Sequence, residues 1–316
     1  MPAGLMQSVD VLKINNSEEL FGIINEVITL NPELNWYAAS PVKKNEYQSI
    51  RMTQLPATAF RKPNEGRPFQ TAVFQPTLHK CFFIDASWIQ DVAIAEQHDW
   101  GKEGAWRQQT QSHLQSAFFQ LSKQIYYGVK NDSLGFPGIV ALMNEFGTAT
   151  NMTYEVAPTA TTNLTSVYAV RTGLLDSQIA WGSEGQFVQD EIKQQLWPTN
   201  TAPASAAGFQ VYTQRLGGWV GFQVVSQWSL GRISKISTGT NQGLTDNHLF
   251  EYLSRCPADK EPQAWFMTRR SQEQLRRSRT ATNATGAPAP TPTEVAGIPI
   301  IVTGAISDKE ETILTP

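Results

Sequence analysis

The longest periodic pattern of apolar and polar positions runs from Gly104 to Tyr127. Leu114, Phe118, Leu121 and Ile125 recur at spacings of three or four residues, and mostly glutamines and lysines fill the opposite positions. The spacing predicts an amphipathic helix about 36 Å long, at roughly 1.5 Å per residue. A helix of this length is expected to act as a long structural support rather than as a short core helix.

Two other patterns precede this helix. Residues 17 to 30 begin with Ser17 and carry apolar residues at helical spacing until Pro32, which predicts a short amphipathic helix. From Glu46 to Phe83, prolines and a glycine separate extended runs such as Phe69–Phe74. That pattern excludes a helix and predicts two long strands around a turn, an arm with little core of its own.

The second half of the chain alternates short strand-like and helix-like runs. Residues 148–163 are rich in threonine and alanine and indicate a loop. The predicted strands are 166–171, 209–216, 220–225, 263–268 and 298–303, and the predicted helices are 187–195, 245–255 and 271–278. Clusters of Pro, Thr, Ala and Gly at 198–208, 236–245 and 280–297 indicate surface loops. The predicted class is α+β.

Composition narrows the possible functions. With 316 residues and 41% apolar content, the chain is long enough for one large or two modest folded domains. A net charge of -3 is too small for nucleic-acid binding by the chain as a whole. Cys81 and Cys256 are too few for a disulfide framework, and neither a signal peptide nor a membrane span is evident. We therefore expect a soluble protein made in a cytoplasm.

Catalytic motifs are weak. There is no phosphate-binding glycine loop ending in Lys-Ser or Lys-Thr, and Gly182–Gly185 lacks the residue that a nucleophile elbow needs between its first glycine and the serine. That segment is expected to form a turn. The four histidines have no metal-ligand spacing and are expected at the surface or at helix caps; they are His79, His98, His113 and His248.

Two charged groups of residues each allow a functional and a structural interpretation. The acids between 85 and 103 could be paired for acid–base catalysis or could form a solvated or partner-facing surface; they are Asp85, Asp91, Glu96, Asp99 and Glu103. The arginines between 269 and 279 could hold phosphates or could pair with acids on a structural helix; they are Arg269, Arg270, Arg276, Arg277 and Arg279. No aromatic residue interleaves with these arginines, which disfavours base stacking.

Charge is also segregated along the chain. Residues 43–80 hold seven basic and two acidic residues, a net charge of +5, and residues 81–103 hold five acids and one lysine, a net charge of -4. An isolated two-stranded ribbon is marginal in water. Laying the arm across an acidic surface of a neighbouring subunit would bury its apolar side chains and neutralise both segments. Neutralisation within one chain is the alternative.

Taken in order, these segments resemble the major capsid proteins of tailed bacteriophages, which have the Hong Kong 97-like shell fold that encapsulins share. The phrase Leu55–Gly66 resembles the extended loop of that family, Phe82–Glu96 the return strand, and Phe118–Asn144 the spine helix and its exit. Four later phrases resemble strands in family order: Val167–Gly173, Trp228–Ile236, Trp265–Arg270 and Gly297–Thr303.

The resemblance implies four regions. These are an N-terminal arm with a short helix (1–42), an extended β-hairpin loop (43–83), a peripheral domain containing the spine helix (84–147 and 256–316) and an axial domain (148–255). The interface between subunits is expected to include seven residues: Arg61, Lys62, Glu65, Arg67, Asp85, Asp91 and Glu96.

The function implied is that of a non-enzymatic shell subunit without cofactors, located in the virion head after assembly in the host cytoplasm. It would form pentamers and hexamers around packaged double-stranded DNA, which it contacts non-specifically on the inner face. Only about 40 residues precede the loop phrase, so a separate scaffolding protein is expected, besides a portal and decoration proteins. The alternatives are an encapsulin-like compartment with protein cargo, a soluble hydrolase using Asp85 or Asp91, and a nucleic-acid-binding protein using the arginines at 269–279.

Overall fold

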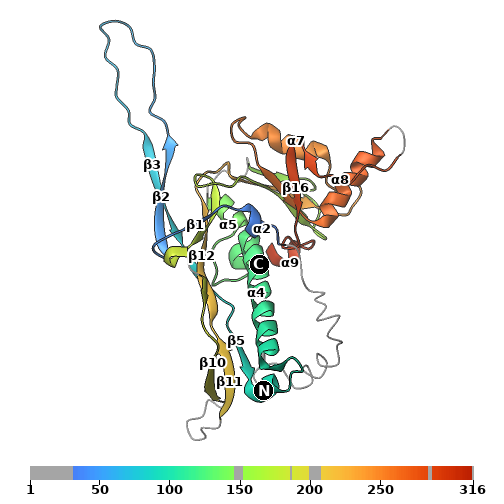
Figure 1. The fold of residues 1–316 in the computed structure, drawn as a ribbon. Coiled ribbons are helices and arrows are strands. Elements are labelled where there is room, and N and C mark those ends of the chain that lie inside the picture. Colours follow the sequence, from blue (N-terminus) through green and yellow to red (C-terminus); the bar gives the residue numbers. More distant parts are fainter. Residues whose placement is uncertain (1–30, 146–151, 186, 199–207, 284–286, 315–316) are drawn as a thin grey trace.

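The structure, a computed structural model, describes residues 31–145, 152–185, 187–198, 208–283 and 287–314. The helix expected over residues 17–30 lies outside the described residues. Helix α4 (Gly101–Tyr127) runs along the body of the molecule. A long hairpin projects from the end of the body that lies away from the start of α4 (Figure 1). The α4 helix begins three residues before the predicted start and ends at the predicted residue, so the prediction of a long helix is confirmed.

Beside α4 lies a three-stranded sheet in the order β10 (Lys193–Pro198), β11 (Gly208–Gln214), β5 (Trp88–Asp91). Trp88 of β5 is buried, and its indole N–H is 3.0 Å from both Thr110 Oγ1 on α4 and Gln214 Oε1 on β11. Helix α3 (Val92–Glu96) follows β5 directly. The indole therefore ties the sheet to the middle of the long helix.

A second sheet joins this part to the rest of the molecule. Its order is β1 (Ala39–Pro41), β8 (Ser177–Trp181), β12 (Leu216–Val224), β4 (Phe82–Asp85), and β9 (Phe187–Gln189) also pairs with β12. The helix predicted over 187–195 is wrong, because this segment forms β9 and the start of β10. Both strands depend on hydrogen bonds to strands further along the chain, which local periodicity does not reveal.

The largest sheet has six strands and contains most of the core. Its order is β15 (Glu294–Val295), β16 (Ile298–Val302), β14 (Ala264–Met267), β7 (Thr165–Val170), β13 (Leu230–Ile236), β6 (Thr153–Glu155). Helices α7 (Asp246–Arg255) and α8 (Arg269–Ala281) pack on it, and Tyr252 of α7 meets Trp265 edge to face at 5.6 Å. The expected boundary at 255/256 runs through this sheet rather than between sheets, since β14 pairs with β7.

The remaining elements are short. They are α2 (Glu33–Trp36), η1 (Gly128–Lys130), α5 (Ile139–Glu145), η2 (Ser183–Gly185) and α9 (Glu311–Leu314). The turn predicted at Gly182–Gly185 is confirmed, with Ser183 and Glu184 both at positive φ. None of the helices described in the structure is long and apolar enough to cross a membrane.

Two of the four histidines are buried, which corrects the expectation that all lie at the surface or at caps. His79 is only 8% exposed, and its Nε2 lies 2.7 Å from Ser49 Oγ. His98 is 4% exposed, although its Nδ1 also accepts a hydrogen bond from the backbone N–H of Trp100 at the start of α4. His248 forms a capping box with Thr245 at the start of α7, as expected.

Candidate subunit interface

The projecting hairpin consists of β2 (Glu46–Gln54) and β3 (Val73–Lys80), joined by the loop 55–72 (Figure 1). The two strands are antiparallel, with Glu46 opposite Lys80 at the base and Gln54 opposite Val73 at the far end. The prediction of two long strands around a turn is confirmed. Among the described strands, none pairs with this hairpin, because β2 and β3 form a two-stranded sheet of their own.

One face of the hairpin is polar and anchors its base. Tyr47 lies opposite His79, and the Tyr47 hydroxyl donates a hydrogen bond of 2.6 Å to Gln223 Oε1 on β12. Further out, Arg51 lies opposite Gln75 and donates to its Oε1 at 2.8 Å. Cross-strand pairs and the body of the molecule therefore both supply hydrogen-bond partners to this polar face.

The other face is apolar and open to solvent. Ile50 lies opposite Pro76, Met52 opposite Phe74, and Gln48 opposite Leu78. Alternate residues of a strand point to opposite sides, so these side chains share one face. Of the seventeen large apolar side chains exposed in the described residues, eight belong to the hairpin and its loop: Ile50, Met52, Leu55, Phe60, Phe69, Val73, Phe74 and Leu78.

Such a face is unusual for a surface that stays in water. Contiguous exposed apolar patches mark sites of protein interaction, and a lone two-stranded hairpin is marginally stable at best. Covering the face would gain about 25 cal/mol per Å² of apolar surface removed from water. The geometry indicates an interaction surface that no part of the chain described in the structure covers.

The loop at the end of the hairpin carries the basic residues. Arg61 donates from Nη1 to the Glu65 carbonyl oxygen at 3.1 Å, and Arg67 donates to the Ala59 carbonyl oxygen at 3.5 Å. Arg61, Lys62 and Glu65 are exposed, and Arg67 is half-buried. The loop braces its own backbone while presenting its charges to solvent.

The predicted acidic partners lie on the body, away from the loop. Asp91 caps α3 by accepting from the Ala93 N–H at 2.9 Å, and Asp85 Oδ1 accepts from the Ser87 N–H at 2.9 Å. Glu96 is exposed at the end of α3. The loop and β5 are at opposite ends of the molecule in Figure 1. The hairpin loop is therefore not neutralised by these acids of its own chain, and contact with another copy stays a prediction.

The arginines of α8 pair with nearby acids. Arg279 lies 2.7 Å from Asp246 on α7, Arg270 lies 3.3 Å from Asp308, and Glu273 lies 3.4 Å from Arg269 and 3.8 Å from Arg276. This arrangement agrees with the structural interpretation of the cluster. Arg277, the remaining arginine of the predicted cluster, is exposed and lines a pocket beside α8.

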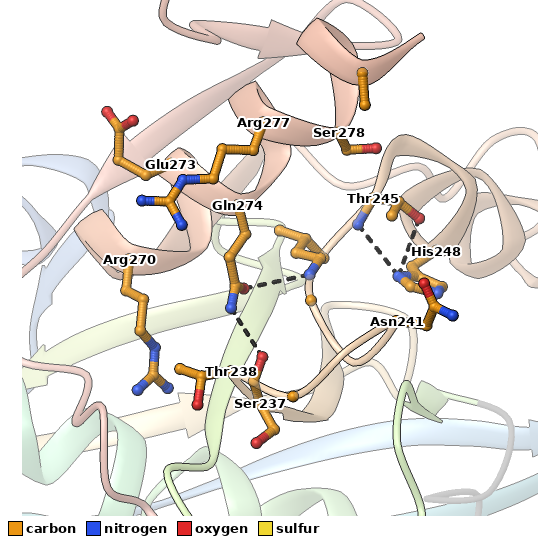
Figure 2. Close-up of a pocket in the computed structure, with 14 residues that line it drawn as sticks. Ser237, Thr238, Asn241, Thr245, His248, Arg270, Glu273, Gln274, Arg277 and Ser278 are labelled. Carbon is orange, nitrogen blue, oxygen red and sulfur yellow. Dashed lines mark hydrogen bonds between the residues drawn. The ribbon is translucent and has the colours of Figure 1, made fainter.

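That pocket, of about 720 Å³, lies between α8 and the segment joining β13 to α7 (Figure 2). Gln274 spans it, accepting from the Leu244 N–H at 3.3 Å and donating to the Ser237 carbonyl oxygen at 2.8 Å. His248 faces it while its Nδ1 takes part in the α7 cap. The polar side chains here support the local backbone. No group of three or more potential metal ligands occurs among the residues that the structure describes.

Comparison with known proteins identifies the fold. No family model and no curated protein sequence matches the chain. A chain in the solved structure of bacteriophage Epsilon15 aligns over 96% of both chains with a TM-score of 0.73 and 13% identity. Weaker likenesses are to the bacteriophage JBD30 capsid (TM-score 0.49, 12% identity, 89% of this chain and 93% of that chain) and to an encapsulin of Synechococcus elongatus (0.45, 8%, 72% and 95%). The chain thus has the Hong Kong 97-like shell fold, with its extended hairpin loop and long spine helix.

Proposed function

We propose that this protein is the major structural subunit of an icosahedral shell, the head of a tailed bacteriophage, which encloses double-stranded DNA. The observation that carries the proposal is the hairpin, whose apolar face and basic loop are left exposed by the residues that the structure describes. Further copies of the chain would supply the missing cover. The likeness to a chain of bacteriophage Epsilon15 over 96% of both chains supports it.

The energetics suit assembly from many modest contacts. Association entropy consumes much of the free energy gained from burying apolar area, so one hairpin contact would be weak alone. In a closed shell every copy places its hairpin on one neighbour and is contacted by the hairpin of another. Many such contacts act together. The net charge of -3 also suits a wall that contacts DNA without binding it tightly.

The proposed role is structural rather than catalytic. Asp85 and Asp91, the acids that a hydrolase would use, accept hydrogen bonds from backbone N–H groups, Asp85 from Ser87 and Asp91 from Ala93 at the start of α3. The other proposed partners follow from the fold by analogy: a separate scaffolding protein, a portal, decoration proteins and the packaged DNA. Pentamers and hexamers of the chain would build the virion head, which is assembled in the host cytoplasm. A shell with protein cargo would share the fold, and the contents of purified particles separate the two.

Charge reversal at the loop tests the proposal. Arg61→Glu with Lys62→Glu should prevent particle formation, because the reversed loop would face acids on its neighbour, while the circular dichroism spectrum of the free subunit stays unchanged. The matched control is Lys43→Glu with Lys44→Glu, an equal charge change at exposed positions before β2. Normal particles from the loop variant, or equal loss in the control, would contradict the assignment of the loop.

A further inference from the structure

Residues 31–37, which contain α2, lie against the end of α4 (Figure 1). In the part of the chain that the structure describes, only side chains bind this segment to the body. The backbone N–H groups of Trp36 and Tyr37 donate to carbonyl oxygens of the same segment. The next residue, Ala38, donates to the Thr172 hydroxyl at 2.7 Å and leads into β1. The segment, here called the strap, can therefore separate from the body at Ala38 without breaking any strand pairing.

Aromatic contacts attach the strap to two sheets. The Tyr37 ring meets Phe222 of β12 edge to face at 5.3 Å and stacks on Phe266 of β14 at 6.2 Å. Trp36 meets Phe266 edge to face at 6.4 Å. Both phenylalanines are buried. Burial of these rings favours the attached strap.

Polar groups of the strap oppose this attachment. Of the eleven buried side-chain N and O atoms without a hydrogen-bond partner in the described residues, four belong to the strap: Asn31 Oδ1, Glu33 Oε2, Trp36 Nε1 and Tyr37 Oη. A buried polar atom without a partner has lost its hydrogen bonds to water. Separation of the strap would return all four atoms to water, so the strap is easier to release than its aromatic contacts alone indicate.

Glu33 is the strap residue whose burial depends on charge. Its side chain is fully buried, and its Oε1 accepts a hydrogen bond of 2.9 Å from the Tyr126 hydroxyl. Among the described residues, no cation pairs with this carboxyl. Burial raises the pKa of Glu33 above its ordinary value, although the hydroxyls of Thr303, Tyr126 and Ser122 act in the opposite direction. The attached strap therefore favours the uncharged carboxyl.

The groups around this carboxyl do not supply a compensating positive charge. Tyr126 faces it from α4 and Tyr37 from the strap itself, and Tyr168 of β7 lies 4.8 Å from the Tyr126 ring. Burial raises the pKa of all three tyrosines, so they stay uncharged. Beyond Tyr168, Arg232 and Glu310 are paired with each other at 2.9 Å. Ionisation therefore leaves one negative charge in an aromatic site.

We propose that the strap is a pH-sensitive switch, which separates from the body when Glu33 ionises and pivots at Ala38. Its release uncovers the rings of Phe222 and Phe266. Below about pH 4.5 the carboxyl is protonated in both forms and the strap stays attached. As pH rises, the released form gains up to about tenfold per pH unit, until the pH passes the pKa of Glu33 in the attached form. The inference concerns the single chain and does not depend on the shell function.

Hydrogen–deuterium exchange of the full-length subunit, followed by mass spectrometry, tests the switch. A helix as short as α2 is unstable away from the body, so the Trp36 and Tyr37 amides exchange when the strap separates. Wild type and Glu33→Gln are compared at the same pH, which cancels the intrinsic exchange rate. The ratio of their strap exchange rates should rise about fivefold or more between pH 4 and pH 7. A ratio that does not change with pH would overturn the role of Glu33.

Two controls show whether the release is local. Glu96→Gln, the same change at an exposed carboxylate, should reproduce the wild-type pH dependence. The amides of β7, which is buried throughout, should exchange far more slowly than those of the strap. Strap amides that exchange no faster than β7 would mean that the strap opens only when the whole subunit unfolds, and the switch would be refuted.

A second pair of variants tests the contact itself. Tyr126→Phe removes the hydrogen bond to Glu33 and should speed strap exchange about threefold or more. Tyr127→Phe is the matched control, because its neighbouring buried hydroxyl donates to Glu310 instead, and it should leave strap exchange nearly unchanged. Equal effects of the two substitutions on the strap would contradict the proposed contact.

Discussion

The guanidinium of Arg232 on β13 lies 2.9 Å from the carboxylate of Glu310 in the interior, where the Glu310 side chain is only 2% exposed. The hydroxyls of Tyr127 and Tyr168 each donate to the same carboxylate at 3.1 Å, and Ser166 donates to it as well. Burial and the nearby Glu310 charge raise the pKa of both tyrosines, so they remain protonated donors. Glu310 thus joins the end of α4, the six-stranded sheet and the C-terminal segment.

Glu310→Ala should lower the free energy of unfolding by about 3 to 5 kcal/mol, because it leaves the Arg232 charge buried without its partner. Urea denaturation followed by circular dichroism measures this. Lys309→Ala, at the exposed neighbouring position, serves as the control and should change stability by less than about 0.5 kcal/mol. A loss below about 1 kcal/mol for Glu310→Ala would contradict the role of the network.

A second buried carboxylate, Glu33, should make stability depend on pH. It lies on α2 and accepts a hydrogen bond of 2.9 Å from Tyr126. Burial raises the pKa of Glu33 above its ordinary value of 4.5, so the folded state favours the protonated form. The stabilising contribution is complete below the unfolded pKa and is lost as pH rises through the folded pKa.

Glu33→Gln should therefore remove part of the decline in stability above about pH 4.5 and should stabilise the subunit at pH 7. Thermal unfolding of both proteins between pH 4 and pH 8 measures the difference. Burial also lowers the pKa of His79, His113 and His248. Because both proteins contain these histidines, the effect of their titration on stability cancels in the comparison. A difference between the two proteins that does not change with pH would refute the assignment.

The junction after the spine helix depends on two glycines. Gly128 has φ of +55°, and a side chain there would overlap the backbone nitrogen of Gly138. Gly128→Ala should lower stability by roughly 2 to 5 kcal/mol, combining the strain of positive φ with backbone overlap. Gly66→Ala, where no atom lies within 4 Å of the added carbon, should have little effect. Equal melting temperatures for the two variants would contradict this packing.

The two faces of the hairpin should respond differently to the same change. Phe74 and Gln75 are adjacent on β3, are both exposed and point to opposite faces. Phe74→Thr should weaken assembly at least tenfold, because about 1.5 to 3 kcal/mol comes from burying a large apolar side chain. Gln75→Thr should leave assembly nearly unchanged. Sedimentation velocity of both variants gives the assembled fraction, and equal assembly would argue against the apolar face as the contact.

Local pattern in the sequence was sufficient for much of the fold. The spine helix, the hairpin and helices α7 and α8 follow from periodicity, prolines and caps, which act within a few residues. Strands β9 and β10 were missed because they form only against β11 and β12. The pairing of β14 with β7 and β16 also joins strands that lie far apart in the sequence, which local pattern does not reveal. The expected domain boundary at 255/256 therefore runs through this sheet.

The proposed interface could be predicted from the sequence only in part. Charge counts along the chain located the basic loop and the acidic segment. Which face of the hairpin is exposed could not be read from residue types, because it depends on the register that places Phe74 opposite Met52 and on the anchor from Tyr47 to Gln223. Burial of His79 follows from the same anchoring, which a lone histidine in a strand does not indicate.

Electron microscopy of the chain, expressed alone and with the proteins encoded beside it, tests the central claim most directly. The shell function predicts closed icosahedral particles in which the hairpin of each copy lies on a neighbouring copy. A discrete monomer or dimer under every condition, with the hairpin folded against its own body, would contradict it.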